Sequence, residues 1–313
     1  MHFRELLAFV EEMTLRTGYP VPAPPGFASE WSRGLGIEGA GTGRLLFTGA
    51  LYQLAPYIAR LADFLRGVEG ARSSAAVIRA ARIAAGVVDL SRLPVMSPDP
   101  ELLEWSRRVL RSVAGLLRSS GVAFDYVPEV SDMYSGALLR ELGLRRAFEA
   151  HARRVLEAIR SAGAREVVTV DPHTHAALLD AAAALGADLR VVSYLQLVSP
   201  AGRAAAGRAL AVHDSCIYAR ALGLSGRVRE LLAAAGARVV EPPRSGRWTY
   251  CCGGPVESLM PSLSLSVART RAAELESVAR EAVTMCPICY VNLRRASRSL
   301  GLLDVAEVLG GGG

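Results

Sequence analysis

Residues 279–289 read AREAVTMCPIC, which combines a strand pattern with a metal-ligand pattern. The apolar stretch 281–285 is followed at once by Pro287, which is typical of a buried strand that ends where a helix begins. Cys286 and Cys289 have the Cys-x-x-Cys spacing with which two thiolates reach one metal ion or one edge of a cluster. The stretch therefore predicts a strand, a pair of thiolates and a helix in succession.

An earlier segment repeats this stretch without its cysteines. Residues 164–172 read AREVVTVDP and agree with residues 279–287 at six of nine positions, so that Asp171 replaces Cys286 and Thr174 replaces Cys289. Two further pairs of segments align: DMYSGALL (132–139) with TYCCGGPV (249–256), and RLLFTGA (44–50) with LAVHDSC (210–216). The chain thus contains two copies of one unit, and the first copy has lost every cysteine.

Both copies show the same alternation of short apolar strands and helices. The predicted strands are 44–48, 122–127, 166–170 and 189–193 in the first copy, and 209–213, 237–241, 281–285 and 302–306 in the second. Long helices are predicted at 137–161 and 256–279. This alternation predicts an α/β fold of two pseudo-repeated, Rossmann-like domains, each a parallel sheet flanked by helices. The motif segments would lie at the carboxyl ends of strands, where such folds bind their ligands.

The remaining segments define the domain limits. Residues 3–16 have the apolar spacing of an amphipathic helix, and residues 17–42 are rich in proline and glycine. The first copy carries a helical insertion, since 83 residues separate Ala50 from Tyr134 but only 34 separate Cys216 from Cys251. We expect an N-terminal helix and connector at 1–42, a degenerate domain at 43–200 and an intact domain at 201–313.

All five cysteines lie in the last hundred residues: Cys216, Cys251, Cys252, Cys286 and Cys289. Disulfides are disfavoured because the count is odd and the N-terminus has no apolar signal segment. A zinc site with four thiolates would leave one cysteine over and would not explain the adjacent pair. Gly253 and Gly254 follow that pair and allow backbone N–H groups to approach sulfur closely.

This pattern of Cys, Cys-Cys-Gly and Cys-x-x-Cys resembles the CCG (cysteine-rich) domain family, which includes heterodisulfide reductase subunits B and D and the iron–sulfur subunits of glycolate oxidase. The resemblance implies a [4Fe-4S] cluster of the non-cubane type, with the five cysteines as ligands and Gly253 and Gly254 beside it. Zinc in the same pocket is the alternative. In larger relatives a segment similar to Trp31 and Gly34-Leu35-Gly36 precedes the first CCG domain.

The resemblance also implies a role as an electron-transfer subunit of a heterodisulfide-reductase-like oxidoreductase complex. The expected partners are a ferredoxin-like iron–sulfur subunit, a flavoprotein dehydrogenase, or a small thiol or disulfide molecule. Two alternatives stay open: a single-site disulfide or thiol reductase, and a zinc-binding structural subunit. The sequence does not decide whether the chain is itself an enzyme.

The composition bears on the binding partners of the protein and on its location in the cell. The net charge is +6 and its positive part is entirely arginine, scattered without interleaved aromatic residues, which argues against nucleic-acid binding. No apolar run reaches about 18 residues, so we expect no membrane span and a cytoplasmic location. The scarcity of asparagine and glutamine suggests a thermophilic source.

Several polar and aromatic residues near the motifs are further candidates for a functional role. Asp171, His173 and His175 form either a replacement metal site or a polar loop whose histidines cap a helix. We expect His213 to form a hydrogen bond to cluster sulfur or to backbone rather than to ligate metal. Trp248 and Tyr250 flank the cysteine pair, where they either shield a cluster from solvent or pack ordinarily.

Overall fold

The computed structural model describes residues 3–39, 41–71, 74–85 and 89–311. In chain order its elements are α1 (Phe3–Thr17), η1 (Phe27–Ser32), β1 (Arg44–Phe47), α2 (Leu51–Val68), α3 (Ser74–Ala84), η2 (Leu90–Arg92), η3 (Pro94–Met96), α4 (Pro100–Ser119), α5 (Pro128–Ser131), α6 (Ala137–Glu141), α7 (Arg145–Ser161), β2 (Glu166–Thr169), α8 (Pro172–Leu185), β3 (Arg190–Ser193), α9 (Tyr194–Leu197), β4 (Ala209–His213), α10 (Cys216–Arg220), α11 (Ser225–Ala234), β5 (Arg238–Val240), η4 (Gly246–Trp248), η5 (Gly254–Val256), α12 (Pro261–Glu276), β6 (Glu281–Thr284), α13 (Pro287–Ala296), β7 (Gly301–Asp304) and α14 (Val305–Gly310).

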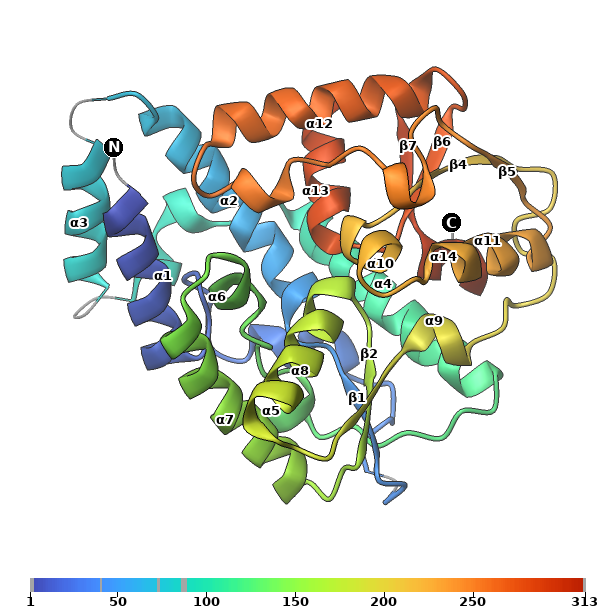
Figure 1. The fold of residues 1–313 in the computed structure, drawn as a ribbon, viewed down its shortest axis with the longest axis horizontal. Coiled ribbons are helices and arrows are strands. Elements are labelled where there is room, and N and C mark those ends of the chain that lie inside the picture. Colours follow the sequence, from blue (N-terminus) through green and yellow to red (C-terminus); the bar gives the residue numbers. More distant parts are fainter. Residues whose placement is uncertain (1–2, 40, 72–73, 86–88, 312–313) are drawn as a thin grey trace.

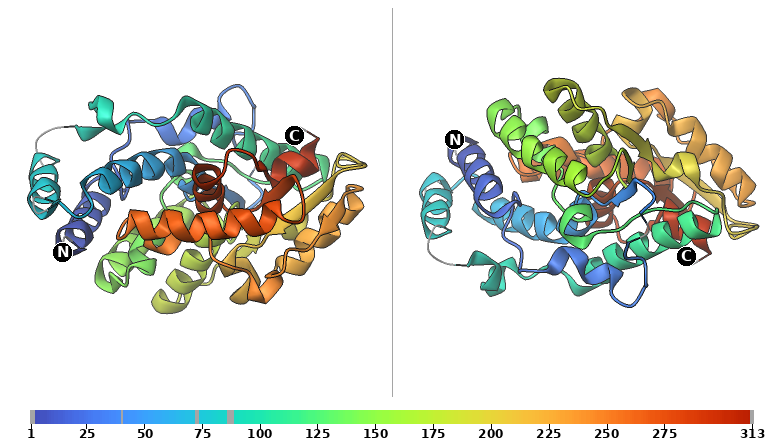
Figure 2. Two further views of the ribbon diagram at one scale, coloured as in Figure 1. Left: turned by 90° about the horizontal axis from the view of Figure 1, so that it is seen from above. Right: turned by 90° about the horizontal axis from the view of Figure 1, so that it is seen from below.

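Two separate parallel sheets form the framework (Figure 1). The first has the strand order β1-β2-β3, and the second has the order β5-β4-β6-β7. Helices flank both sheets, and seen from above α12 lies on the outer side of the second one (Figure 2). The predicted fold class, parallel sheets flanked by helices in two related units, is confirmed.

The strand predicted at 122–127 does not form. Only Asp125 joins the first sheet there, as an isolated bridge to Leu45 with hydrogen bonds to the backbone of Arg44 and Leu46. Pro128 then begins the short helix α5 and has no N–H group to continue a ladder. Its counterpart in the second copy does pair, as β5, so the first sheet has one strand fewer.

The two long helices predicted at 137–161 and 256–279 are each interrupted. Gly143, with φ of 72°, separates α6 from α7, because a left-handed residue cannot continue a right-handed helix. In the second copy Pro261 opens α12 after a separate 3₁₀ turn, since proline is tolerated at the first helical position but not inside a helix. The apolar periodicity predicted the helical segments correctly but did not reveal these breaks.

The inserted helices of the first copy pack against the second copy. The rings of Trp105 on α4 and Tyr290 on α13 are stacked, with centroids 3.8 Å apart and planes 7° apart. The hydroxyl of Tyr52 on α2 donates to a carboxylate oxygen of Asp304 at 2.7 Å. These contacts join the two sheets through the insertion, which therefore serves as internal packing.

The connector after α1 is fixed by a buried carboxyl group. Asp132 accepts hydrogen bonds from Trp31 Nε1 (3.2 Å), Thr48 Oγ1 (2.8 Å), Gln53 Nε2 (3.2 Å) and the hydroxyl of Tyr126. Burial nevertheless dominates and raises the pKa of Asp132 to about 7, although each of these donors lowers it. Within the described residues, no helix combines the length and the apolar character needed to cross a membrane.

Candidate metal centre

Two paired strands bring Cys216 and Cys286 to the same edge of the second sheet. β4 ends at His213 and β6 at Thr284, and these two residues are register partners. Cys216 follows as the first residue of α10, and Cys286 is the residue immediately before α13. Because the carboxyl ends of parallel strands meet at one edge, both thiols lie there.

The loop before η5 carries Cys251 and Cys252 to this edge. The guanidinium of Arg220 on α10 donates to the carbonyl oxygens of Arg247 (3.1 Å) and Thr249 (2.6 Å) in this loop. These two bonds hold the loop against α10, which is the helix that begins with the first cysteine of the motif.

The two glycines after the cysteine pair are needed for close packing. Gly253 has φ of 86°, and its N–H group donates to Sγ of Cys251 at 3.3 Å. A Cβ atom at Gly253 would lie 2.4 Å from the backbone oxygen of Ser264. A Cβ atom at Gly254 would lie 3.4 Å from Sγ of Cys252. Packing therefore requires glycine at both positions, against Ser264 at Gly253 and against Ile288, 2.6 Å from such a Cβ atom, at Gly254.

The five thiols gather in one place. Cys252, Cys286 and Cys289 are buried, while Cys216 and Cys251 are partly exposed. Hydrogen bonds join Cys252 to Cys251 and to Cys289, and join Cys286 to Cys289. Burial, and next the charges of Cys252 and Cys286, raise the pKa of Cys216, which lies at the same sheet edge at the start of α10. All five predicted ligand residues are thus brought together.

The hydrogen bonds within this group favour thiolates at two positions. Hydrogen bonds from Cys251 and Cys289 hold the pKa of Cys252 well below its ordinary value. Burial raises the pKa of Cys286, but the hydrogen bond from Cys289 and the influence of His173 outweigh burial and lower the pKa to about 6. Thiolate is the form in which cysteine binds soft metals, so the group is suited to such a metal.

A buried imidazole faces these thiols from β4. The ring of His213 has a nitrogen within 4.8 Å of the sulfur atoms of Cys252 and Cys289. Its Nδ1 accepts a hydrogen bond from Nε of Arg271 at 3.0 Å, and a guanidinium can only donate. The neutral ring therefore carries its proton on Nε2, which has no partner among the described residues. In this tautomer the N–H group at Nε2 is the one that can donate to a sulfur atom.

A second imidazole comes from the copy that has no cysteines. Nε2 of His173 lies 3.2 Å from Sγ of Cys286, and its Nδ1 lies 2.5 Å from a carboxylate oxygen of Glu141. A cavity of about 50 Å³ adjoins this contact and is lined by His173 and Gly254, among others. The first half of the chain therefore forms one wall of the site in the second half.

Comparison with known proteins agrees with this geometry. The family model of the cysteine-rich domain, CCG, matches residues 210–294. The chain contains a CCG domain.

Two curated proteins are similar over a larger part of the chain. An "EtfAB:quinone oxidoreductase" of Syntrophomonas wolfei subsp. wolfei is 27% identical over 226 residues, covering 65% of this chain and 32% of that protein. A "Probable membrane-anchored ferredoxin" of Chromohalobacter salexigens is 28% identical over 254 residues, covering 69% of this chain and 37% of that protein. The chain thus spans about a third of the length of these curated relatives.

One solved structure is a weak match. The aspartate racemase homologue PH1733 of Pyrococcus horikoshii OT3 gives a TM-score of 0.27 at 12% identity, over 66% of this chain and 91% of that chain. A likeness at this level carries no argument about the CCG domain.

The polar residues predicted as a replacement metal site do not converge. Asp171 caps α8 by accepting from the backbone N–H groups of His173 and Thr174, each at 2.9 Å. Nδ1 of His175 instead contacts the hydroxyl of Thr169 at 2.8 Å. In the described part of the first half, no three His, Cys, Asp or Glu side chains bring ligand atoms within 4.8 Å of one another. The helix cap is also Asp171, and not a histidine.

Side chains fill the position that the CCG cysteines would occupy in the first half. Ser135 and Thr174 take the places of Cys252 and Cys289, and their hydroxyl groups lie 3.3 Å apart. Thr174 is so close to the backbone of Gly49 that a Cβ atom there would lie 2.1 Å from its hydroxyl oxygen. The degenerate site is therefore closed by packing.

The two aromatic residues beside the cysteine pair differ in their contacts and in their exposure to solvent. The ring of Tyr250 lies under the guanidinium of Arg244, 3.8 Å from centroid to carbon. Trp248, in contrast, is 84% exposed. The prediction that Trp248 shields the site or packs ordinarily is wrong, because its side chain projects into solvent.

Sequence reasoning missed two supporting residues, Arg271 and Glu141. Arg271 is fully buried and lies on the inward face of α12 with Ala268 and Leu275, at helical spacing. An arginine on an otherwise apolar stripe is a signal that could have found it. Nothing in the spacing of Glu141 points to His173, 32 residues away.

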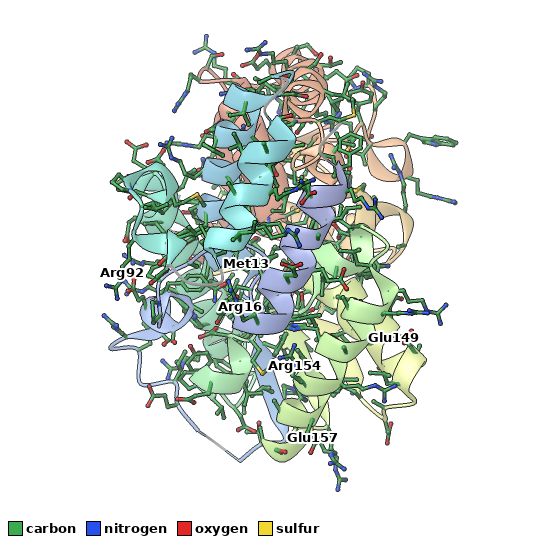
Figure 3. The ribbon with its side chains drawn as sticks, turned by 90° about the vertical axis from the view of Figure 1, so that its left-hand side faces the viewer. Met13, Arg16, Arg92, Glu149, Arg154 and Glu157 are labelled. Atoms are coloured by element: carbon green, nitrogen blue, oxygen red, sulfur yellow. The ribbon has the colours of Figure 1, made fainter. Side chains whose placement is uncertain are left out.

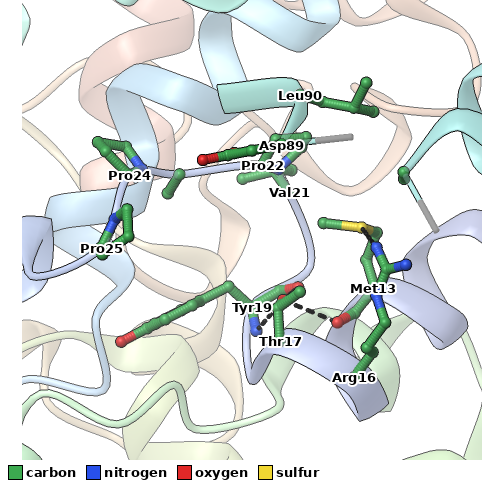
Figure 4. A pocket seen from close by; sticks show the side chains of 12 residues that line it. Met13, Arg16, Thr17, Tyr19, Val21, Pro22, Pro24, Pro25, Asp89 and Leu90 are labelled. Atoms are coloured by element: carbon green, nitrogen blue, oxygen red, sulfur yellow. Dashed lines mark hydrogen bonds between the residues drawn. The ribbon is translucent and has the colours of Figure 1, made fainter. Parts of the chain in front are cut away.

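A hollow of about 560 Å³ lies elsewhere, between α1, the connector and the start of η2 (Figure 4). Met13 and Arg16, which line it, are labelled on α1 in Figure 3. Met13, Arg16 and Tyr19 line it together with a run of proline residues. It contains neither a cysteine nor a histidine. This hollow therefore offers no thiol or imidazole ligand for a metal ion.

Proposed function

We propose that this protein is an iron–sulfur electron-transfer subunit of a redox complex. The observation that carries the proposal is the convergence of five thiols from three segments of the chain at one sheet edge. The ligands would be Cys216, Cys251, Cys252, Cys286 and Cys289. Cysteine thiolates are the usual ligands of iron–sulfur clusters.

The number and arrangement of the thiols favour a [4Fe-4S] cluster of the non-cubane type. One zinc ion or one cubane cluster takes four cysteine ligands, whereas this site offers five. Cys251 and Cys252 are adjacent, so their side chains diverge and suit neighbouring metal atoms better than a single one. The spare thiol and the adjacent pair both argue against zinc.

The surroundings of the thiols fit an anionic group. Nε2–H of His213 is buried without a partner, and the N–H group of Gly253 already points to a thiol sulfur. Cys286 also precedes the N-terminus of α13, whose dipole stabilises negative charge. Such donors are the means by which proteins tune an iron–sulfur site.

When bound, the cluster would supply one-electron transfer. The chain's own residues bind it through sulfur, direct donors toward it and exclude water around the buried thiols Cys252, Cys286 and Cys289. Cys216 and Cys251 are partly exposed, so they mark the side nearest to solvent. Electrons would enter or leave on that side.

The proposed partner is a ferredoxin-like iron–sulfur subunit or a flavoprotein dehydrogenase in a heterodisulfide-reductase-like complex. The names of the two relatives support a redox assembly of this kind, since one is a quinone oxidoreductase and the other a ferredoxin. Direct reduction of a disulfide is less well supported. The cavity beside His173 is small, at about 50 Å³.

The test is metal analysis of protein purified without oxygen. We would determine iron, sulfide and zinc per chain and record an EPR spectrum for wild type, Cys251→Ser, Cys252→Ser and the control Ser135→Ala. About four irons with matching sulfide, lost in the cysteine variants and kept in the control, are expected. Zinc alone, with no iron after reconstitution, would overturn the proposal.

A further inference from the structure

We propose that Trp248 and two neighbouring arginines form the docking surface for an acidic redox protein. We call Trp248, Arg247 and Arg220 the Trp248 surface. This inference rests on the proposed function and goes beyond it, because it names where the partner binds and what charge the partner carries.

Trp248 is the most exposed large apolar side chain in the described chain. It is 84% exposed, and Ile83 follows at 66%. Leaving an indole in water forgoes the free energy of burial, about 25 cal/mol for each Å² of apolar surface. Exposed aromatic residues of this kind are enriched at the centres of protein interfaces and often dominate their binding energy.

The backbone that carries Trp248 is held firmly. Arg220 binds the carbonyl oxygens on both sides of it, those of Arg247 and Thr249. The N–H group of Gly246 donates to a carboxylate oxygen of Asp214 at 2.7 Å. The indole is therefore presented from a fixed loop, and little backbone ordering remains to be done when a partner binds.

The Trp248 surface lies beside the two least buried thiols. Cys251 follows Trp248 by three residues in the same loop, and η4 packs against α10, which begins at Cys216. These two cysteines are partly exposed, whereas the other three are buried. A protein docked here would approach the metal centre from its most accessible side.

The charge of the Trp248 surface and its neighbours is net positive. Arg247 is exposed and has no side-chain partner among the described residues, and Arg220 binds only carbonyl oxygens at its loop. The nearby carboxylates of Asp214 and Glu241 both pair with Arg229, which leaves one negative charge, so with Arg220 and Arg247 the region carries a net charge of +1. An acidic partner would neutralise this charge and would be steered to the surface by it.

The experiment measures electron transfer from an acidic plant-type [2Fe–2S] ferredoxin, reduced beforehand, to the reconstituted protein by stopped-flow absorbance. Trp248→Ala and Arg247→Glu are compared with the matched controls Ile83→Ala and Arg153→Glu, which change an exposed residue on α3 and on α7. We expect both test variants to lower the second-order rate constant by roughly tenfold or more, and the controls to leave it unchanged.

The dependence of the rate on ionic strength, and the direct reduction of the cluster by dithionite, distinguish the possible outcomes. The wild-type rate should fall as ionic strength rises, and this dependence should weaken in Arg247→Glu. Equal rates in all variants, with a cluster that dithionite still reduces directly, would overturn the docking surface alone. A chain that binds no iron would overturn the proposed function, and the docking inference with it.

Discussion

Replacing His213 by asparagine tests whether this buried imidazole donates to the metal centre or ligates it. The asparagine Oδ1 takes the place of Nδ1 and can still accept from Arg271, which is 3.0 Å from Nδ1 in the wild type. The shorter side chain has no N–H group at the position of Nε2. The change therefore removes one donor and keeps the buried arginine paired.

The expected effect is a more negative reduction potential. A hydrogen bond to a charged group contributes about 1.5–3 kcal/mol, and only its strengthening on reduction, about 1 kcal/mol, changes the potential. Since 59 mV corresponds to a tenfold change, about 1.4 kcal/mol, in a one-electron couple, the shift should be about −40 mV. The sign follows because reduction adds negative charge, which the lost donor had stabilised.

The assay is a redox titration followed by EPR, with iron content measured on the same samples. Iron should be retained in His213→Asn, and His213→Gln, whose amide reaches nearer to the Nε2 position, should recover part of the shift. Loss of iron would mean that His213 is a ligand, and an unchanged potential would mean that its Nε2–H group does not face the cluster. Either result refutes the inference that Nε2–H donates to the metal centre.

Three further predictions concern packing and pH. Gly254→Ala should reduce iron content severalfold, because the added Cβ atom would lie 2.6 Å from the Cγ2 atom of Ile288 and 3.4 Å from Sγ of Cys252; Ile288→Ala in the same chain removes Cγ2 and should restore part of the iron. Trp105→Ala should lower the free energy of unfolding by about 3–5 kcal/mol, measured by denaturant titration, because it empties a buried site stacked on Tyr290. The raised pKa of Asp132, about 7, means that the folded state binds a proton which the unfolded state has released above pH ~4. The free energy of unfolding should therefore be greatest near pH ~4 and fall by roughly 2–4 kcal/mol as the pH rises to 7. Denaturant titrations of Asp132→Asn at the same pH values should show a smaller fall, and an equal fall would contradict the assignment.

Much of the fold followed from local patterns in the sequence. Six of the eight predicted strands lie within two residues of β1–β4, β6 and β7, and 237–241 contains β5. Residues 164–172 and 279–287 repeat one another, and β2 and β6 lie at equivalent positions within them. These features depend on short-range apolar spacing, which a sequence displays directly.

What the sequence did not display are contacts between distant segments. The failed strand at 122–127 was apolar enough, but the helical turn at Pro128 ends it. His173 reaches Cys286 across 113 positions, and its role depends on how the two copies are packed together. The exposure of Trp248 likewise depends on loop anchoring by Arg220. The domain limits and the assignment of the five cysteines as ligands remain predictions.

The contact between Thr174 and Gly49 makes the loss of the first site hard to reverse. Reintroducing cysteines at the five ancestral positions would not recreate a metal centre, because the volume it needs is now occupied by main chain and a hydroxyl group. A cysteine at Ala50 or Ser135 would place a larger sulfur atom in a closed space, and a cysteine at Tyr134 would leave a cavity, so these changes would destabilise the chain. The two copies therefore have different roles: the second carries the thiols, and the first supports them structurally.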